Sequence, residues 1–153
     1  MLRIGVLSDT HATSFTELPN KILATLAEVD MIIHAGDFTT RNVLDGLRQL
    51  GEVHAVHGNM DSSELKQLLP EKELVIVSGN RLGITHGWGS PDGIENRVSR
   101  LFSDVDIIVY GHSHHPKNEV IDGILFFNPG RARESFGILT IGKQVKGEII
   151  RLT

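Results

Sequence analysis

Residues 2–11 have the sequence LRIGVLSDTH, an apolar run that leads into two side chains able to bind a metal. Ile4 to Leu7 form a short aliphatic run, which is typical of a buried strand. Asp9 and His11 follow this run and are separated by one residue, so side chains that leave the strand together can converge on one cation. The stretch therefore predicts a strand that ends in a ligand-bearing loop.

The same arrangement occurs four more times, each time after an apolar run that predicts a strand. The four segments are Ala35-Gly36-Asp37, Gly58-Asn59-Met60-Asp61, Thr85-His86-Gly87 and Gly111-His112-Ser113-His114. Ligands of open α/β sheets bind beyond the carboxyl ends of the strands, so we expect all five segments to lie at one edge. The segments supply seven candidate metal ligands: Asp9, His11, Asp37, Asn59, His86, His112 and His114.

The regions between these segments predict alternating strands and helices, followed by a run of short strands. Expected helices cover residues 18–26, 43–50, 62–69 and 94–102. Expected strands cover residues 4–7, 31–33, 53–56, 74–77, 81–85, 107–110, 120–121, 125–127, 137–141 and 147–152, with a hairpin turn at Gly79-Asn80. This order predicts an α/β sandwich whose sheets are mixed rather than wholly parallel.

The composition fits one domain over residues 1–153, because 40% apolar residues can bury a core without crosslinks. The chain has no cysteine, which excludes disulfides and thiolate metal sites. The net charge of −4 comes without long runs of one sign, so nucleic acid is not indicated as a partner. A net charge of this size does not exclude a local basic patch. The apolar run from Leu2 to Leu7 is too short for a signal peptide or a membrane span, so we expect a cytoplasmic protein without a membrane partner.

The candidate ligands predict a site for two divalent transition-metal ions. A carboxylate such as Asp37 can bridge two ions, and Asn59 offers a neutral carbonyl ligand. Imidazoles combined with carboxylates and an amide suit Mn, Fe, Zn, Co or Ni better than Mg or Ca, and Mn is the expected ion. A mononuclear zinc site would not need seven ligands. Two ions about 3.5–4 Å apart lower the pKa of a shared water and hold a phosphoryl group for in-line displacement.

The five segments, in this order and spacing, resemble the signature blocks of the calcineurin-like metallophosphoesterase superfamily, and in particular its small single-domain bacterial and archaeal phosphodiesterase branch. Asn128-Pro129-Gly130 resembles a further element of that branch. The resemblance implies a four-layer α-β-β-α sandwich with two mixed β-sheets, and a hydrolase that cleaves small-molecule phosphodiesters with a metal-bridging hydroxide. It places Asp9, His11, Asp37 and His114 on one metal and Asp37, Asn59, His86 and His112 on the other, with Asp37 as the bridge.

Met60 departs from the pattern of the superfamily. The third block of the superfamily usually carries a histidine between the Asn and the acidic residue, where it is thought to contact the phosphate and help protonate the leaving group. The thioether of Met60 cannot donate a proton. General acid assistance is worth about 10²–10⁴ in rate, so we expect weak or no phosphomonoesterase activity and better cleavage of activated or aryl diesters.

Other residues near the blocks have both structural and functional interpretations. Asn59 and Asp61 are the expected catalytic residues; Asp61 could cap the following helix, and we expect it also to hydrogen-bond a metal-bound histidine. His57 could replace the missing proton donor and Arg131 could reach a phosphate, but structural or solvated roles are more common for both. Trp88 could line the substrate cleft or pack. Hydrogen-bonded positions in the core are expected for the histidines that match no ligand position, His34, His54 and His115.

A protein-assembly scaffold on the same fold is the alternative function, because the small retromer subunit resembles this branch. That subunit lacks some of the histidine ligands, whereas this chain retains all seven ligand positions, which favours an enzyme. The natural substrate and the identity of the bound metals stay open. Small members of the family often form dimers, but no apolar stripe in the sequence identifies an interface for a homodimer.

Overall fold

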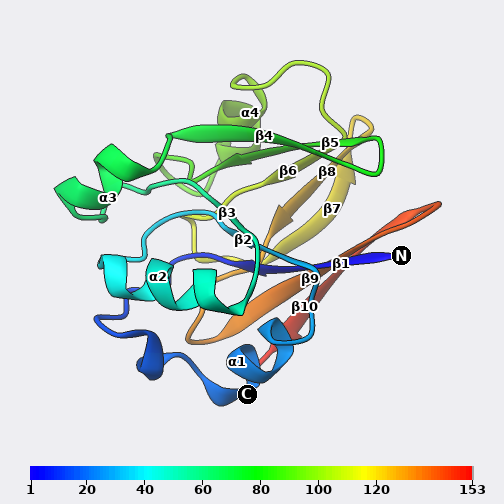
Figure 1. The fold of residues 1–153 in the computed structure, drawn as a ribbon. Coiled ribbons are helices and arrows are strands. Elements are labelled where there is room, and N and C mark those ends of the chain that lie inside the picture. The colour runs from blue at the N-terminus through cyan, green and yellow to red at the C-terminus, as the bar shows by residue number, and fades with distance from the viewer. Residues whose placement is uncertain (153) are drawn as a thin grey trace.

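The computed structural model describes residues 1–152 and contains two five-stranded sheets (Figure 1). The first sheet, in the order β10-β9-β1-β2-β3, comprises β1 (Leu2–Leu7), β2 (Met31–His34), β3 (Val53–Ala55), β9 (Ser135–Ile141) and β10 (Val145–Arg151). The second, in the order β4-β5-β6-β8-β7, comprises β4 (Lys72–Val77), β5 (Asn80–Thr85), β6 (Ile107–Val109), β7 (Lys117–Ile121) and β8 (Ile124–Asn128). The helices are η1 (Phe15–Glu17), α1 (Asn20–Leu26), α2 (Arg41–Leu50), α3 (Ser63–Leu68) and α4 (Ile94–Ser99). Within the described residues, every helix is too short or too polar to cross a lipid bilayer.

Both sheets are mixed, as the sequence predicts. In the first sheet β1, β2 and β3 run parallel, whereas β9 is antiparallel to β1 and β10 is antiparallel to β9. In the second sheet β5, β6 and β8 run parallel, and the edge strands β4 and β7 are antiparallel to their neighbours. The parallel strands of each sheet therefore have their carboxyl ends at a common edge.

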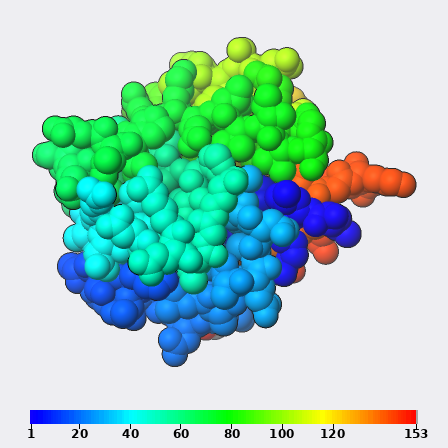
Figure 2. All heavy atoms as spheres, in the orientation of Figure 1, coloured from blue at the N-terminus to red at the C-terminus, as the bar shows by residue number. Residues whose placement is uncertain are grey.

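The two sheets pack face to face and carry helices on their outer faces, which confirms the four-layer sandwich. The core between the sheets includes Ile4, Val6 and Ile33 of the first sheet and Leu82, Ile84 and Val109 of the second. Helices α1 and α2 pack on the first sheet through Ile22, Leu26, Val43, Leu44 and Leu47, and α4 packs on the second through Ile94 and Val98. Figure 2 shows the blue and cyan segments of the first half adjoining the green segments of the second sheet.

Many element boundaries differ from the prediction by one to three residues, and three of the differences have a clear local reason. The first helix begins at Asn20 rather than residue 18, because Pro19 pushes Leu18 into an extended conformation with ψ 141°. The hairpin turn lies at Ser78-Gly79 rather than Gly79-Asn80, and these two residues have φ angles of 48° and 81°, as a two-residue hairpin loop requires. The last helix ends at Ser99 rather than residue 102, since the following N–H groups donate three residues back in a tighter turn.

His54 is hydrogen-bonded, as the sequence predicts, but it is only partly buried rather than a core residue. Its Nδ1 lies 3.0 Å from Glu73 Oε1 and its Nε2 lies 2.8 Å from Glu52 Oε2. The ring therefore links β3, at the edge of the first sheet, to β4, at the edge of the second. Partial burial works to lower the pKa of His54, but the hydrogen bonds to Glu73 and Glu52 outweigh it and raise the pKa. The folded protein therefore binds the His54 proton more tightly than the unfolded chain does.

We expect this ion-pair network to stabilise the protein only while His54 is charged. Its contribution is fully present below the unfolded pKa of about 6.5 and is lost as the pH rises through the raised folded pKa. The double variant Glu52→Gln/Glu73→Gln should lose roughly 1 kcal/mol of unfolding free energy near pH 6 and less near pH 9, measured by urea denaturation. Glu148→Gln, at an exposed position on β10, is the control. An equal loss at both pH values would contradict the assignment.

Candidate metal centre

The five candidate segments lie at the carboxyl ends of β1, β2, β3, β5 and β6, as the sequence predicts. Five of the seven candidate ligands have positive φ angles: Asp9 (53°), His11 (46°), Asp37 (64°), His112 (68°) and His114 (64°). Such angles are uncommon for residues other than glycine, and they persist only where the surrounding structure imposes them. The loops are therefore folded into strained conformations that aim these side chains.

The side chains of five candidate ligands converge into two overlapping groups. Asp9, His11 and His114 form one group, and Asp9, Asp37 and His86 form the other; within each group the ligand atoms lie within 4.8 Å of one another. Asp9 Oδ1 lies 3.4 Å from His114 Nε2, 3.8 Å from His86 Nε2 and 3.9 Å from His11 Nε2. Asp37 Oδ2 lies 3.2 Å from His86 Nε2 and 3.8 Å from His11 Nε2. Both carboxylates thus face more than one histidine, and Asp37 as the metal bridge stays a prediction.

Three of the atoms that face the centre lack hydrogen-bond partners, whereas the second carboxylate oxygens of Asp9 and Asp37 accept hydrogen bonds. Asp9 Oδ1, His11 Nε2 and His86 Nε2 are buried and unpartnered. Asp9 Oδ2 accepts hydrogen bonds from Ser8 Oγ (2.6 Å) and His112 N (3.2 Å), and Asp37 Oδ1 accepts one from Met60 N (2.8 Å). Buried polar atoms are otherwise almost always paired, so these three atoms fit a bound cation.

His86 shows how the fold prepares a metal ligand. Its Nδ1 donates to Ala35 O at 2.7 Å, which directs the Nε2 lone pair of the neutral ring toward the carboxylates. Burial works to lower the pKa of His86, but the adjacent Asp37 and Asp9 carboxylates outweigh it and raise the pKa. Burial likewise works to raise the pKa of Asp37, but His86 and the Met60 N–H outweigh it and lower the pKa. A proton and a metal ion therefore compete for His86 Nε2.

Asn59 and His112, the other two candidate ligands, border this cluster. The imidazole of His112 lies edge-on to that of His86 at a centroid distance of 5.2 Å, and His112 Nε2 donates to Gly89 O at 3.0 Å. The lone pair of His112 is then on Nδ1. Asn59 is exposed, and together with His86 it lines a cavity that is described below. The described structure thus brings Asp9, His11, Asp37, His86 and His114 together and places Asn59 and His112 next to them.

Asp61 hydrogen-bonds backbone N–H groups rather than a histidine, so the expected contact with a metal-bound histidine is wrong. Its Oδ2 accepts hydrogen bonds from Asp37 N (2.9 Å) and Gly58 N (2.8 Å), and its Oδ1 accepts one from Thr39 N (2.8 Å). The helix that follows is capped by Ser62, whose hydroxyl accepts from Leu65 N. Asp61 is buried and ties the loop after β2 to the loop after β3.

His34 and Asn128, neither of them a predicted metal ligand, hold the ligand loops. His34 is fully buried and stacks on Phe38; its Nδ1 accepts from Gly36 N (3.0 Å) and its Nε2 lies 3.3 Å from Thr10 Oγ1. Burial, with the nearby His86, lowers the pKa of His34 to about 3, so the ring is neutral. Asn128, also buried, donates to Gly111 O and Ser113 Oγ and so fixes the loop that carries His112 and His114.

Two glycines allow the backbone to touch the carboxylates. A Cβ at Gly58 would lie 2.2 Å from Asp37 Oδ1, and a Cβ at Gly111 would lie 1.9 Å from Ser8 Oγ and 2.8 Å from Asp9 Oδ2. Any side chain at either position would displace a candidate ligand.

Gly58→Ala should lower activity by roughly 100-fold, because a misplacement of about 1 Å in a catalytic group costs that much. The measurement is the diesterase rate at saturating metal, together with the metal content of the purified variant. Gly51→Ala is a matched control, since Gly51 has an extended backbone and a Cβ there meets nothing within 4 Å. Activity of Gly58→Ala equal to that of Gly51→Ala would contradict the steric role of Gly58.

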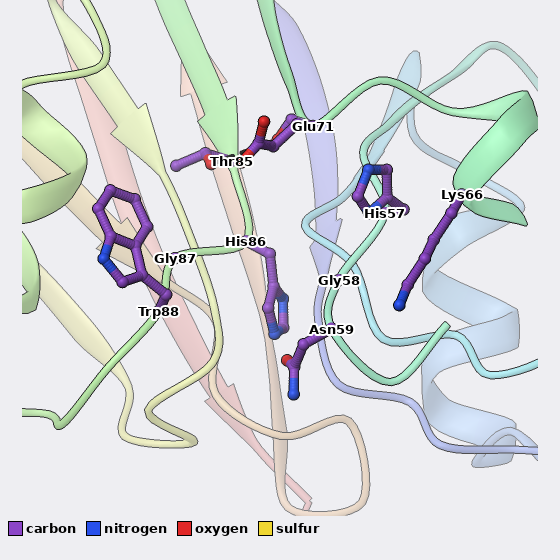
Figure 3. Close-up of a pocket in the computed structure, with 9 residues that line it drawn as sticks. All are labelled: His57, Gly58, Asn59, Lys66, Glu71, Thr85, His86, Gly87 and Trp88. Atoms are coloured by element: carbon purple, nitrogen blue, oxygen red, sulfur yellow. Dashed lines mark hydrogen bonds between the residues drawn. The ribbon is translucent and has the colours of Figure 1, made fainter. Parts of the chain in front are cut away.

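Two cavities border the centre. The larger has a volume of 270 Å³ and is lined by His57, Gly58, Asn59, Lys66, Glu71, Thr85, His86, Gly87 and Trp88 (Figure 3). The smaller has a volume of 110 Å³ and lies beside His11, with Thr10 and Arg133 in its wall. His57 and Trp88 therefore line the larger cavity. Arg131 forms an ion pair with Glu134. His115 is exposed, so its predicted place in the core is wrong; its backbone N–H donates to Ser113 Oγ.

Comparison with known proteins assigns the chain to one family. The sequence-family model of the calcineurin-like phosphoesterase superfamily domain matches residues 2–142, a range that includes all seven candidate ligands. The chain belongs to this superfamily. Calcineurin-like phosphoesterases use divalent metal ions, and the clustered Asp and His side chains are the candidate sites for them here.

Curated relatives within the superfamily are archaeal and bacterial metallophosphoesterases. A probable metallophosphoesterase of Methanocaldococcus jannaschii is 37% identical over 131 residues, which are 83% of this chain and 66% of that protein. A phosphodiesterase of the same organism is 31% identical over 159 residues, which are 92% of this chain and 91% of that protein. The chain thus spans slightly less than two thirds of the first relative and most of the second.

Solved structures of superfamily proteins share the whole fold. The solution structure of a Thermotoga maritima protein matches 99% of this chain and 100% of its own, with a TM-score of 0.80 and 33% identity. Vps29 from Entamoeba histolytica, in complex with Zn²⁺, matches 99% of this chain and 100% of its own, with a TM-score of 0.76 and 25% identity.

Proposed function

We propose that this calcineurin-like phosphoesterase is a dinuclear metal-dependent phosphodiesterase. The observation that carries the proposal is the convergence of Asp9 Oδ1, His11 Nε2 and His86 Nε2, all buried and without hydrogen-bond partners. The relative that is named a phosphodiesterase supports the reaction class. We further propose Mn²⁺ as the preferred ion, with Fe, Ni, Zn or Co as alternatives, because the ligands mix imidazole with carboxylate.

The seven candidate ligands would be shared between two metal ions. Asp9, His11, Asp37 and His114 would hold one ion, and Asp37, Asn59, His86 and His112 the other, as the family pattern implies. Bound ions of this kind activate water at neutral pH and neutralise charge on the phosphoryl group. Asp61 keeps Asp37 and the Asn59 loop at a fixed spacing through its three backbone hydrogen bonds. Asn59 sits exposed beside His86, where its amide can orient the phosphoryl oxygens.

Met60 and the two cavities favour diesters over monoesters. The side chain of Met60 is 59% exposed and has no proton to give, and only its backbone N–H contacts a candidate ligand, Asp37. A leaving alcohol must therefore depart without help from this position. A diester also carries two ester groups, and cavities border the centre at both His86 and His11.

With Mn²⁺ added, bis(p-nitrophenyl) phosphate should be hydrolysed faster than p-nitrophenyl phosphate. Both release the same phenolate, so the comparison isolates the preference for a diester. The kcat/KM should be higher for the diester, because its second ester group can occupy a cavity beside the centre. Metal-free enzyme is the control. Faster monoester hydrolysis would refute the specificity, and no hydrolysis of either substrate would refute the enzyme.

The alternative is the non-catalytic assembly scaffold that the resemblance to the small retromer subunit implies. The shared fold of Vps29 keeps this alternative open. The complete set of seven candidate ligands and the unpartnered atoms at their centre favour the enzyme. Turnover that requires metal separates the two functions.

A further inference from the structure

The larger cavity beside the metal centre has one aromatic wall and one polar wall. Figure 3 shows Trp88 on one side of His86, with His57 and Lys66 on the other. His86 and Asn59 are candidate metal ligands as well as lining residues, so the cavity is continuous with the place where the phosphoryl group binds. A substituent of that phosphoryl group can extend between the two walls.

Trp88 is held in place from two directions although its indole is not part of the core. Its side chain is 45% exposed. Arg97 on α4 donates from Nε to Trp88 O (2.8 Å) and from Nη1 to Asp92 O (3.0 Å), and it also bonds Ser90 O. His112 Nε2 bonds Gly89 O from the metal side. The backbone around Trp88 is therefore fixed, and the indole presents a ready surface next to the phosphoryl site.

The opposite wall offers both donors and acceptors. Lys66 contributes an ammonium group and Glu71 a carboxylate. His57 lines the same wall, and its Nδ1 is buried without a hydrogen-bond partner. An aliphatic or simple aryl group would leave these polar groups unused. A planar heteroaromatic base would use both walls. Its face can stack on an aromatic side chain, and its edges can hydrogen-bond the polar groups.

We propose that this cavity binds a nucleoside-type ester group, so that the substrate is a phosphodiester with a heteroaromatic base. The base stacks on Trp88, and the polar edges of the base and sugar face Lys66, Glu71 and His57. The volume of 270 Å³ is close to the lower end of ligand pockets, about 300–1,000 Å³, which suits a single nucleoside rather than a polymer. This assignment of substrate class rests on the phosphodiesterase function proposed above.

The test uses product binding, which does not depend on turnover. Trp88 is the only tryptophan of the chain, so its intrinsic fluorescence reports directly on this cavity. Mn²⁺-loaded protein is titrated with adenosine 5′-monophosphate and with ribose 5-phosphate, which has the same phosphate and sugar but no base. We expect quenching by the nucleotide alone. Calorimetry should show the nucleotide binding roughly tenfold more tightly, the scale of one base–aromatic stacking contact.

Three variants and one control variant locate the contact. Trp88→Leu should bring the affinities for the two compounds within about threefold of each other, and Trp88→Phe should retain most of the difference, because phenylalanine also stacks. Lys66→Gln should weaken nucleotide binding, whereas Lys21→Gln on α1 should not. Equal affinity of wild type for the two compounds, or a preference unchanged in Trp88→Leu, would overturn the proposal. Hydrolysis of bis(p-nitrophenyl) phosphate is measured on the same samples, so failure of the enzymatic function is recognised separately.

Discussion

Asp37→Asn should lower the proposed diesterase activity by about three powers of ten and prevent binding of the proposed second metal ion. Asparagine has the shape of aspartate, and its amide oxygen can still accept the hydrogen bond from Met60 N. It lacks the negative charge that faces His86 and His11. Metal-based charge stabilisation is worth several kcal/mol in the transition state, and each 1.4 kcal/mol corresponds to about tenfold in rate.

Three measurements separate this effect from a loss of fold. Elemental analysis after loading with Mn²⁺ should show less metal in Asp37→Asn than in wild type. Addition of Mn²⁺ should raise the melting temperature of wild type by mass action but raise that of the variant much less. The melting temperatures without metal should differ little. Asp45→Asn, which removes an exposed carboxylate from α2, should leave activity and metal content unchanged. Full activity in Asp37→Asn would refute the metal centre.

The placement of the ligands could be predicted from the sequence because it follows from chain direction. Apolar runs such as Ile4 to Leu7 predict strands, and the carboxyl ends of parallel strands meet at one edge. Asp9 and Asp37 therefore had to lie near each other once β1 and β2 paired in parallel. The four-layer arrangement, in contrast, came from the family resemblance, since periodicity does not say how two sheets stack.

The contacts that hold the ligands could not be predicted, because they join side chains to distant backbone. Asp61 and Asp37 N are 24 residues apart, and His34 and Thr10 are also 24 residues apart. A polar residue type does not show which N–H or hydroxyl it will meet after folding. The same limit explains the expectation that Asp61 contacts a histidine: carboxylates commonly do so near metals, but here backbone donors occupy both of its oxygens.

Asp61→Ala should destabilise the protein by about 3–5 kcal/mol, which is a large part of the stability of a typical domain. The substitution leaves the N–H groups of Asp37, Thr39 and Gly58 without their acceptor in a buried place. Each unpaired buried donor costs about 1–3 kcal/mol, and some of them will find water. Urea unfolding in the presence of a chelator measures the loss without metal linkage. Asp45→Ala is the control, and a loss no larger than that of the control would contradict the role.

Asp61→Asn then distinguishes positioning from proton transfer. The amide can keep at most part of the three hydrogen bonds, because one of its two terminal atoms is itself a donor. We expect stability between those of wild type and Asp61→Ala, and metal affinity reduced by about 10–100-fold, as for other residues that orient metal ligands. At saturating metal the variant should retain the shape of the wild-type pH–rate profile, because both carboxylate oxygens of Asp61 accept hydrogen bonds from backbone N–H groups. Loss of one limb of that profile would instead make Asp61 a catalytic acid or base.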